Sequence, residues 1–174
     1  MDASEFQLVM KGYDPNPNAD IEAYSAGPVK TNRSIVRRFL QGAGDNQMTV
    51  LFAQDSDDVG TAEIPASGTV SIDLQTALDQ YTNALGMTDT LLIFVEHKSD
   101  SLSSGMHMEA NAVNGFTNLL SATAALMIPP GSFRAFGDFL ADAMVVGGTN
   151  KVLDLNNDDG SNTAGYRIEV CGRI

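Results

Sequence analysis

The segment DLNNDDG, close to the C-terminus, has residue types that can hold a calcium ion. Asp154, Asn156 and Asp158 place oxygen ligands at alternate positions, as the first half of an EF-hand loop does. The rest of that pattern is missing, because its sixth position is Asp159 instead of glycine and its twelfth is Gly165 instead of glutamate. Three residues therefore remain as calcium candidates, and a polar loop between two strands is the interpretation we favour.

A second acidic cluster consists of Asp55, Asp57 and Asp58. These carboxylates could chelate a cation or contact a partner protein, although a solvated loop is the simpler interpretation. The glycine-rich pieces QGAGD and VVGGTN do not open strand–helix–strand units, so neither predicts a dinucleotide or phosphate loop. We expect no cofactor.

Catalysis by a serine or cysteine nucleophile requires a histidine base and an acid that orients it. The chain has two histidines, His97 at the end of an apolar run and His107 in the polar segment SSGMHME. No serine stands in a GxSxG motif, and the single cysteine, Cys171, alternates with apolar residues as an inert strand thiol would. The sequence therefore predicts no catalytic residues, and we expect a protein that is not an enzyme.

The net charge of −12 argues against nucleic acid as a partner, because binding to phosphates depends on clustered Lys and Arg. One basic segment, KTNRSIVRR, is an exception and contains Arg33, Arg37 and Arg38. These arginines either are solvated or contact an acidic surface, such as another copy of this chain. We retain them, with the Asp55 cluster, as candidate partner contacts. No apolar run approaches the ~20 residues of a membrane span, and the acidic opening lacks a secretory leader, so we expect no membrane contact.

The composition changes near residue 45, which predicts an N-terminal arm (residues 1–45) followed by a β-sandwich domain (residues 46–174). In the arm, Phe6–Met10 could form a short strand, and Ser34–Leu40 could form either a strand or a single helical turn. The turn-forming segment GYDPNPNAD separates the two. We expect the arm to be ordered mainly by contacts with neighbouring molecules.

Many short apolar or alternating segments follow at regular spacing, with Gly and Pro between them. This pattern is typical of an all-β antiparallel sandwich, and we expect a jelly-roll-like arrangement. The predicted strands are Met48–Ala53, Thr61–Ile64, Thr69–Leu74, Thr90–Glu96 as a central strand, Met106–Ala112, Phe116–Leu120, Ala124–Ile128, Ser132–Phe136, Ala141–Val146, Lys151–Leu155 and Tyr166–Cys171. The last two flank a polar loop, and their alternation predicts a half-buried β-hairpin that completes the sandwich.

One short helix is also expected, beginning after Asp73 as its N-cap and ending at Gly86 as a left-handed C-cap residue. Its apolar positions follow the spacing of one helix face, at Leu74, Ala77, Leu78, Tyr81 and Leu85. We expect this helix to cover one end of the sandwich.

Five pieces of the sequence form a recognisable order: GAGDNQMTVLFAQ (42–54), GTVSIDLQTALDQYTNALGMTDTLLIFVEHKS (68–99), NAVNGFTNLL (111–120), LMIPPGSFRAFGD (126–138) and VVGGTNKVLDLNNDDGSNTAGYRIEVCG (145–172). Through these pieces, residues 41–172 resemble a family of small bacteriophage virion proteins. In that family a strand precedes "S-x-DL…AL-D-x-G" and an apolar strand, and an "I-x-PGG" turn, an "AG…D-x-L-x-L-x-N" strand and "Y-x-I-x-I-x-G" follow. The sequence departs from the family in having Pro129-Pro130-Gly131 in place of Pro-Gly-Gly, and residues 1–40 look like an addition.

The resemblance implies a structural protein of the virion, on the capsid surface after assembly in the host cytoplasm. It implies a decoration or cement protein whose partners are the major capsid protein and copies of itself, with a homotrimer at a local threefold axis as the expected state. The alternative is a tail, baseplate or head-fibre component that binds carbohydrate on the host surface. The absence of Trp and of an obvious aromatic platform in the sequence favours the shell.

Overall fold

The fold described here is that of a computed structural model of the chain. It describes residues 4–11, 32–41, 47–56, 62–77, 84–99, 105–121, 123–138 and 144–174. The chain divides into two compact units, Met1–Gln41 and Gly42–Ile174.

The first unit contains a two-stranded antiparallel hairpin. Strand β1 (Ser4–Lys11) pairs with β2 (Asn32–Gln41) in an unbroken register that runs from Ser4 opposite Phe39 to Lys11 opposite Asn32. The strand at Phe6–Met10 is confirmed, and the second segment, which the sequence left open, is a strand instead of a helical turn. The two strands of the predicted arm therefore pair with each other.

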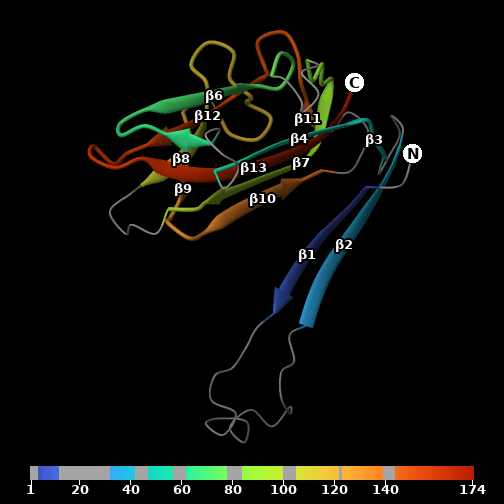
Figure 1. Cartoon of the computed structure of the whole chain (residues 1–174). Coiled ribbons are helices and arrows are strands. Elements are labelled where there is room, and N and C mark those ends of the chain that lie inside the picture. Colours follow the sequence, from blue (N-terminus) through green and yellow to red (C-terminus); the bar gives the residue numbers. More distant parts are fainter. Residues whose placement is uncertain are drawn as a thin grey trace, which may run out of the picture. The chain divides into compact units, whose positions relative to one another are not determined.

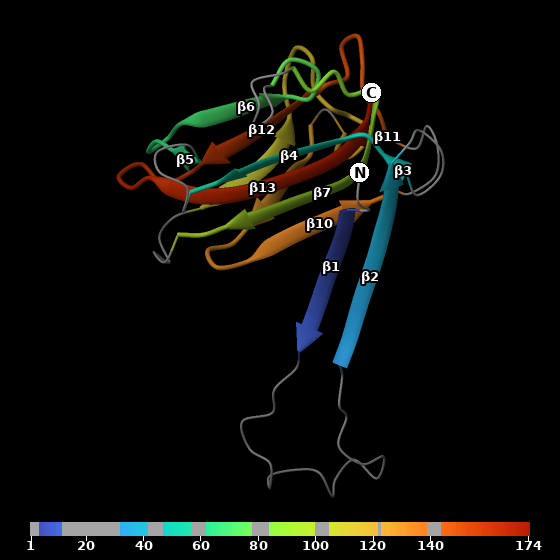
Figure 2. The ribbon, with the colours of Figure 1, turned by 45° about the vertical axis from the view of Figure 1, so that its right-hand side comes forward.

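The second unit is built from antiparallel strands, shown in two orientations in Figures 1 and 2. Its described part contains no helix. The described residues therefore include no helix that is long and apolar enough to cross a membrane. The strands are β3 (Gln47–Met48), β4 (Val50–Asp55), β5 (Glu63–Ile64), β6 (Thr69–Asp73), β7 (Asp89–His97), β8 (Met106–Ala110), β9 (Ala125–Ile128), β10 (Phe133–Gly137), β11 (Met144–Val145), β12 (Val152–Asn157) and β13 (Ala164–Arg173).

Two sheets face each other in this unit. One has the strand order β10-β7-β13-β4, with the short β11 beside β7 and β5 beside β13, and the other has the order β6-β12-β8-β9. The predicted all-β antiparallel architecture is confirmed, and the apolar run Thr90–Glu96 lies in the interior strand β7, as expected.

The core lies between these sheets and follows the period-2 alternation of the strands. On β13 the inward side chains are Ala164, Tyr166, Ile168 and Val170, and on β7 they include Ile93 and Val95. The facing sheet contributes Leu153 and Leu155 from β12 and Met106 and Met108 from β8. Burying each large apolar side chain contributes roughly 1.5–3 kcal/mol, so this shared layer is the main stabilising feature of the sandwich.

The predicted hairpin of residues 151–155 and 166–171 is wrong, because β12 and β13 belong to different sheets. The chain crosses between the sheets through a hydrogen-bonded loop. The buried side chain of Asn157 donates from Nδ2 to the carbonyls of Ile64, Pro65 and Asn162, at 3.2, 3.1 and 2.8 Å. Alternation predicted both strands correctly, but it carries no information about which strand each one pairs with.

The predicted strand Phe116–Leu120 is also wrong, because residues 117–119 form a turn. Asn111 Oδ1 accepts hydrogen bonds from the backbone N–H groups of Val113 and Asn114, which bends the chain out of β8. Phe116 is nevertheless fully buried in the core. The apolar residue was identified correctly, and the local side-chain hydrogen bonds decided its backbone conformation.

The predicted helix after Asp73 is not present in the described residues. Leu74–Thr76 form a turn, and the Leu85 N–H donates to the carbonyl of Ala77 at 2.8 Å, a spacing of eight residues that a continuous α-helix does not have. The middle of the predicted helix, residues 78–83, lies outside the described residues. Gly86 has φ +59°, so the predicted left-handed conformation at this glycine is confirmed.

Asp73 caps the turn after β6. Its Oδ1 accepts hydrogen bonds from the backbone N–H groups of Gln75 and Thr76 at 2.9 and 3.1 Å, and its Oδ2 lies 3.0 Å from Lys151 Nζ. Burial of this carboxyl raises its pKa, but the hydrogen bonds and the Lys151 ammonium lower it by more, so the pKa lies below the usual 3.8.

We predict that Asp73→Asn destabilises the protein by about 0.5–1 kcal/mol at neutral pH. The stabilisation by the Asp73 charge is present above the unfolded-state pKa and is lost as pH falls through the lower folded-state pKa. Urea unfolding at several pH values should therefore show a difference between the two proteins at pH 7 that disappears in acid. Lys151→Met should show the same pH trend, whereas a difference that is unchanged by acid would contradict the assignment.

Thr90 has a buried hydroxyl in β7. Its side chain is 0 % exposed, and Oγ1 has no hydrogen-bond partner among the described residues. A buried hydroxyl without a partner costs about 1–3 kcal/mol. Thr88, two residues earlier, is exposed, and its hydroxyl donates to the Arg173 carbonyl at 3.3 Å.

Replacing Thr90 with valine should therefore stabilise the protein, by about 1 kcal/mol. Thr88→Val is the matched control, since it removes a hydroxyl that has a partner, and it should leave stability unchanged or lower it. Thermal unfolding followed by circular dichroism measures both. A Thr90→Val protein that unfolds at a lower temperature than the wild type would show that the hydroxyl is satisfied.

Candidate functional site

The three calcium candidates lie along one strand at its outer face. Asp154 and Asn156 are alternate residues of β12, and Asp158 follows the end of that strand. Alternate residues on a strand are separated by about 7 Å. The strand therefore spreads these oxygen ligands along a line, and it does not gather them around one point.

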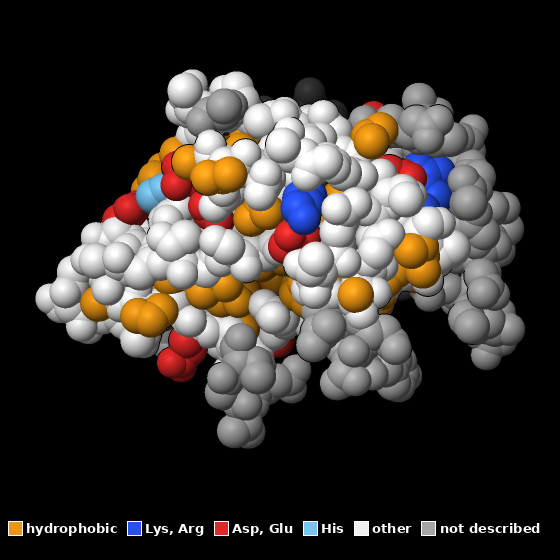
Figure 3. All heavy atoms as spheres, turned by 90° about the horizontal axis from the view of Figure 1, so that it is seen from above, with side chains coloured by type: hydrophobic (Ala, Val, Ile, Leu, Met, Phe, Trp, Pro, Cys, Tyr) orange, Lys and Arg blue, Asp and Glu red, His pale blue; other side chains and the backbone are white. Residues whose placement is uncertain are grey.

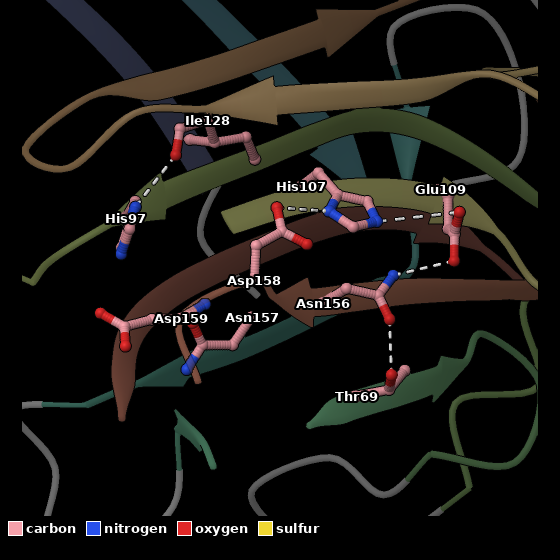
Figure 4. A network of polar contacts seen from close by, with 9 residues as sticks. All are labelled: Thr69, His97, His107, Glu109, Ile128, Asn156, Asn157, Asp158 and Asp159. Carbon is pink, nitrogen blue, oxygen red and sulfur yellow. Dashed lines mark hydrogen bonds and ion pairs between the residues drawn. The ribbon is translucent and has the colours of Figure 1, made fainter. Parts of the chain in front are cut away.

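Asp154 and Asn156 have their polar atoms engaged by neighbouring strands. The Asp154 carboxylate, on a residue that is 7 % exposed, accepts hydrogen bonds from Ser71 Oγ at 2.6 Å and Asn111 Nδ2 at 2.9 Å. Asn156 accepts a hydrogen bond from Thr69 Oγ1 and donates to Glu109 Oε1 (Figure 4). These contacts follow the register, which places Ser71 opposite Asp154 and Thr69 opposite Asn156.

His107 continues this row of polar contacts. Its Nδ1 lies 3.0 Å from Asp158 Oδ2 and its Nε2 lies 3.8 Å from Glu109 Oε2 (Figure 4). Figure 3 shows a histidine side chain at the surface with acidic side chains beside it. Strands β6, β12 and β8 are thus joined across their outer face by side-chain hydrogen bonds and ion pairs.

The loop after β12 is organised around Asp159. Its Oδ1 accepts hydrogen bonds from the backbone N–H groups of Ser161 and Asn162 at 2.8 and 3.0 Å, and its Oδ2 accepts one from Asn162 Nδ2. Such bonds from an Asp to the backbone two and three residues later are typical of a polar turn. In the part of the chain that the structure describes, no group of three His, Cys, Asp or Glu side chains is placed to hold a metal ion.

The predicted partner contacts lie in three places. Asp55, at the end of β4, forms an ion pair with Lys98 Nζ at 2.6 Å and lies 3.7 Å from Arg167 Nε. Asp57 and Asp58 lie outside the described residues. Arg33, Arg37 and Arg38 are residues of β2, at register positions opposite Met10, Phe6 and Glu5 of β1. Asp55 is thus the member of this set whose side-chain contacts the structure describes.

Of the residues considered for catalysis, His97 and Cys171 are buried. His97 ends β7 on the core side, is 0 % exposed, and has Nδ1 2.9 Å from the carbonyl oxygen of Ile128. Cys171 is 5 % exposed on β13, and burial, with a smaller contribution from the charge of Glu169, raises the pKa of its thiol to about 12. A thiol with this pKa is almost entirely protonated at neutral pH and is a poor nucleophile.

The outer face of the β10-β7-β13-β4 sheet carries an aromatic pair that the sequence analysis did not identify. Phe94 of β7 and Phe133 of β10 are stacked, with ring centroids 5.6 Å apart and planes at 28°. The guanidinium carbon of Arg167 on β13 lies 5.9 Å from the centroid of the Phe94 ring, within the range of a cation–π contact. Phe133 is 42 % exposed.

Glu169 and Asp55 hold Arg167 over the Phe94 ring. Arg167 donates to Glu169 Oε1 from both Nε and Nη2, and this hydrogen bonding raises the pKa of the guanidinium above its usual value. One signal of this site was present in the sequence. Phe133 and Phe136 are three residues apart on one strand, so they face opposite sides of the sheet and only one of them can lie in the core. Phe136 packs against the core, and Phe133 faces outward.

No protein-family model and no curated protein matches this chain. Among solved structures it is similar to the PRD1 vertex protein P5, with 12% sequence identity and a TM-score of 0.37 over 96% of this chain and 100% of that chain.

We predict that Cys171 in the native protein is unreactive toward alkylating reagents at pH 8, because the thiol is both buried and protonated. Mass spectrometry should find no label on the folded chain, and one label per chain once denaturant is added. Cys171→Ala should take up no label under either condition. Stoichiometric labelling of the native protein within minutes would show that this end of the sheet opens readily.

Proposed function

We propose that this protein is a non-catalytic structural component of a bacteriophage virion, and that it decorates the capsid as a cement protein. In this role it bridges neighbouring copies of the major capsid protein at the capsid surface. A protein that binds only the assembled shell stabilises that shell by mass action. The sequence resemblance over residues 41–172 is one support, and the strand order of the sandwich is the structural observation that carries the proposal.

The strand order supports a jelly-roll arrangement. Eight strands of the second unit have four or more residues: β4, β6, β7, β8, β9, β10, β12 and β13. Counted along the chain, one sheet contains the first, eighth, third and sixth of these, and the facing sheet contains the second, seventh, fourth and fifth. Double-sheet jelly rolls of eight strands occur in viral capsid proteins and in lectins. This arrangement supports a coat-type domain and leaves a carbohydrate-binding role as the second candidate.

The N-terminal hairpin is a suitable element for contacting the shell. Half of the chain's 10 basic residues, but only five of its 22 acidic ones, lie in Met1–Gln41, so this unit is neutral while Gly42–Ile174 carries the whole charge of −12. Strand β2 contains Arg33, Arg37 and Arg38 and no acidic residue. A two-stranded hairpin is at best marginally stable alone in water, so a partner that covers it would stabilise it. We propose that these arginines face acidic groups of a capsid subunit.

The states of the histidines and the cysteine support a non-catalytic role. His97 and Cys171 are buried, and His107 is held between two carboxylates on a sheet face. The second candidate, a tail, baseplate or head-fibre component that binds host carbohydrate, is favoured by the outward-facing pair Phe94 and Phe133, because sugar rings stack on exposed aromatic side chains. This pair weakens the argument that the sequence alone made against an aromatic platform.

Immunogold labelling of intact virions distinguishes the two candidates. Label spread evenly over the heads is the expected result for a cement protein. Label confined to the tail or to one vertex would contradict the cement role and support the second candidate. In a parallel assay, purified protein added to shells that lack it should raise the temperature at which the shells come apart.

The role of the hairpin is tested by the triple variant Arg33→Glu, Arg37→Glu, Arg38→Glu in the full chain. We expect it to lose shell binding by at least about tenfold, because three attractions are replaced by three repulsions. The matched control replaces the same residues with lysine, keeps the charge, and should bind more tightly than the glutamate variant at low salt. Equal binding by the two variants would exclude the arginines from the contact.

A further inference from the structure

The two sheets of the sandwich differ in charge. The strands of β6-β12-β8-β9 contain Asp73, Glu109 and Asp154 and no Lys or Arg, although Lys151 directly precedes β12. The outer side of β10-β7-β13-β4 carries both signs, with Asp55, Glu96 and Glu169 beside Arg167 and, directly after β7, Lys98. Two copies of a chain with net charge −12 repel each other. The sheet that carries both signs is therefore the face through which copies can approach with less repulsion.

This sheet also carries an exposed apolar surface on its outer side. Leu51 of β4 is 48 % exposed and Phe133 of β10 is 42 % exposed, at opposite edges of the sheet. On the same two edge strands, Ala135 of β10 and Ala53 of β4 are exposed at the register level of the half-buried Phe94. These small side chains leave Phe94 accessible from the edge of the face, next to Arg167. Aromatic residues and arginine are the types enriched at the centres of protein interfaces.

The register makes this face complementary to itself. Phe133 pairs with Glu96, Glu96 pairs with Arg167, and Arg167 pairs with Asp55, so one row across the sheet reads aromatic, acid, base, acid. A twofold axis that lies in the contact plane and runs parallel to the strands reverses this row. It therefore places Arg167 of one copy opposite Glu96 of the other, and Phe133 opposite Asp55. The exposed apolar residues and the charges of both signs all lie on this one surface. The same surface of a second copy can therefore serve as the binding partner.

We propose that two copies of this chain associate face to face through the outer surface of the β10-β7-β13-β4 sheet, centred on Phe94, Phe133 and Arg167. A twofold contact closes after two copies, so the product is a dimer and differs from the trimer that the sequence resemblance implied. Four strands about 4.8 Å apart and paired over about six residues make a face roughly 15 Å by 20 Å. Two such faces bury about 600 Å² in total, less than the roughly 1,200 Å² of stable specific interfaces. The expected dimer is therefore weak and transient, with a dissociation constant of about 100 µM.

Sedimentation velocity of the full-length protein, from about 1 to about 200 µM, tests the proposal. The expected result is a concentration-dependent shift from monomer to dimer. Phe133→Asp and Leu51→Asp, each at a different edge of the face, should weaken the dimer by at least about tenfold, because each places a charge in the contact. Both residues are about half exposed, so both variants should fold, which circular dichroism checks.

Met127→Asp is the matched control. Met127 is 51 % exposed on β9 of the other sheet, so this variant makes the same kind of change outside the proposed contact and should dimerise normally. A protein that stays monomeric throughout the range overturns the proposal. So does an oligomer other than a dimer, or a dimer that Phe133→Asp leaves intact.

The outcome is independent of the proposed shell contact. The glutamate variant of Arg33, Arg37 and Arg38 should still dimerise while losing shell binding, and Phe133→Asp should lose the dimer whether or not the protein is a cement protein. A dimer that dissociates in the arginine variant, but persists in Phe133→Asp, would assign self-association to the hairpin and contradict the contact proposed here.

Discussion

The apolar layer shared by the two sheets determines most other features of the sandwich. Because successive residues of a strand point to opposite sides, burying Ile168 and Val170 of β13 directs Arg167 and Glu169 outward. In the same way, burying Leu153 and Leu155 of β12 directs Asp154 and Asn156 to the opposite outer face. The burial of one side of each strand therefore decides which chemistry each outer surface presents.

The two outer surfaces use their polar residues differently. On the β6-β12-β8-β9 sheet, carboxylates and amides bond across the strands in pairs that match the register, such as Asp154 with Ser71. On the β10-β7-β13-β4 sheet, Arg167 is held by acidic neighbours above the ring of Phe94, next to exposed alanines. The first surface has its hydrogen-bonding groups engaged within the molecule, whereas the second presents apolar area with charges around it. Covering the second surface therefore gives a partner the more favourable binding free energy.

The charge distribution adds a second level of organisation. The net negative charge lies entirely in Gly42–Ile174, and the N-terminal unit is neutral with an arginine-rich β2. Negative charge keeps copies of the sandwich apart in solution, while a basic strand can reach an acidic partner. A surface protein that must bind a lattice at many equivalent positions needs both properties, and this is the physical sense in which the charge pattern fits the proposed role.

The sequence by itself determined features that depend on neighbouring residues in the chain. Period-2 alternation located many of the strands, and the short apolar run Thr90–Glu96 indicated the interior strand β7. A glycine at position 86 indicated the left-handed conformation observed there. Net charge and the positions of the arginines and acids were likewise available at once. Local patterns led to a wrong prediction where the same spacing of apolar residues fits both a helix and a non-helical segment. The apolar spacing after Asp73 suggested a helix, although residues 74–76 form a turn.

The tertiary structure alone decided which segments meet. The pairing of β1 with β2, the placement of β12 and β13 in different sheets, and the meeting of Phe94, Phe133 and Arg167 all join residues far apart in sequence. Alternation specifies that a strand has an inner and an outer side, but the strand's backbone hydrogen bonds can be satisfied by any neighbour. Which neighbour is chosen depends on how the whole set of apolar faces packs into one core, and that is a property of the complete chain.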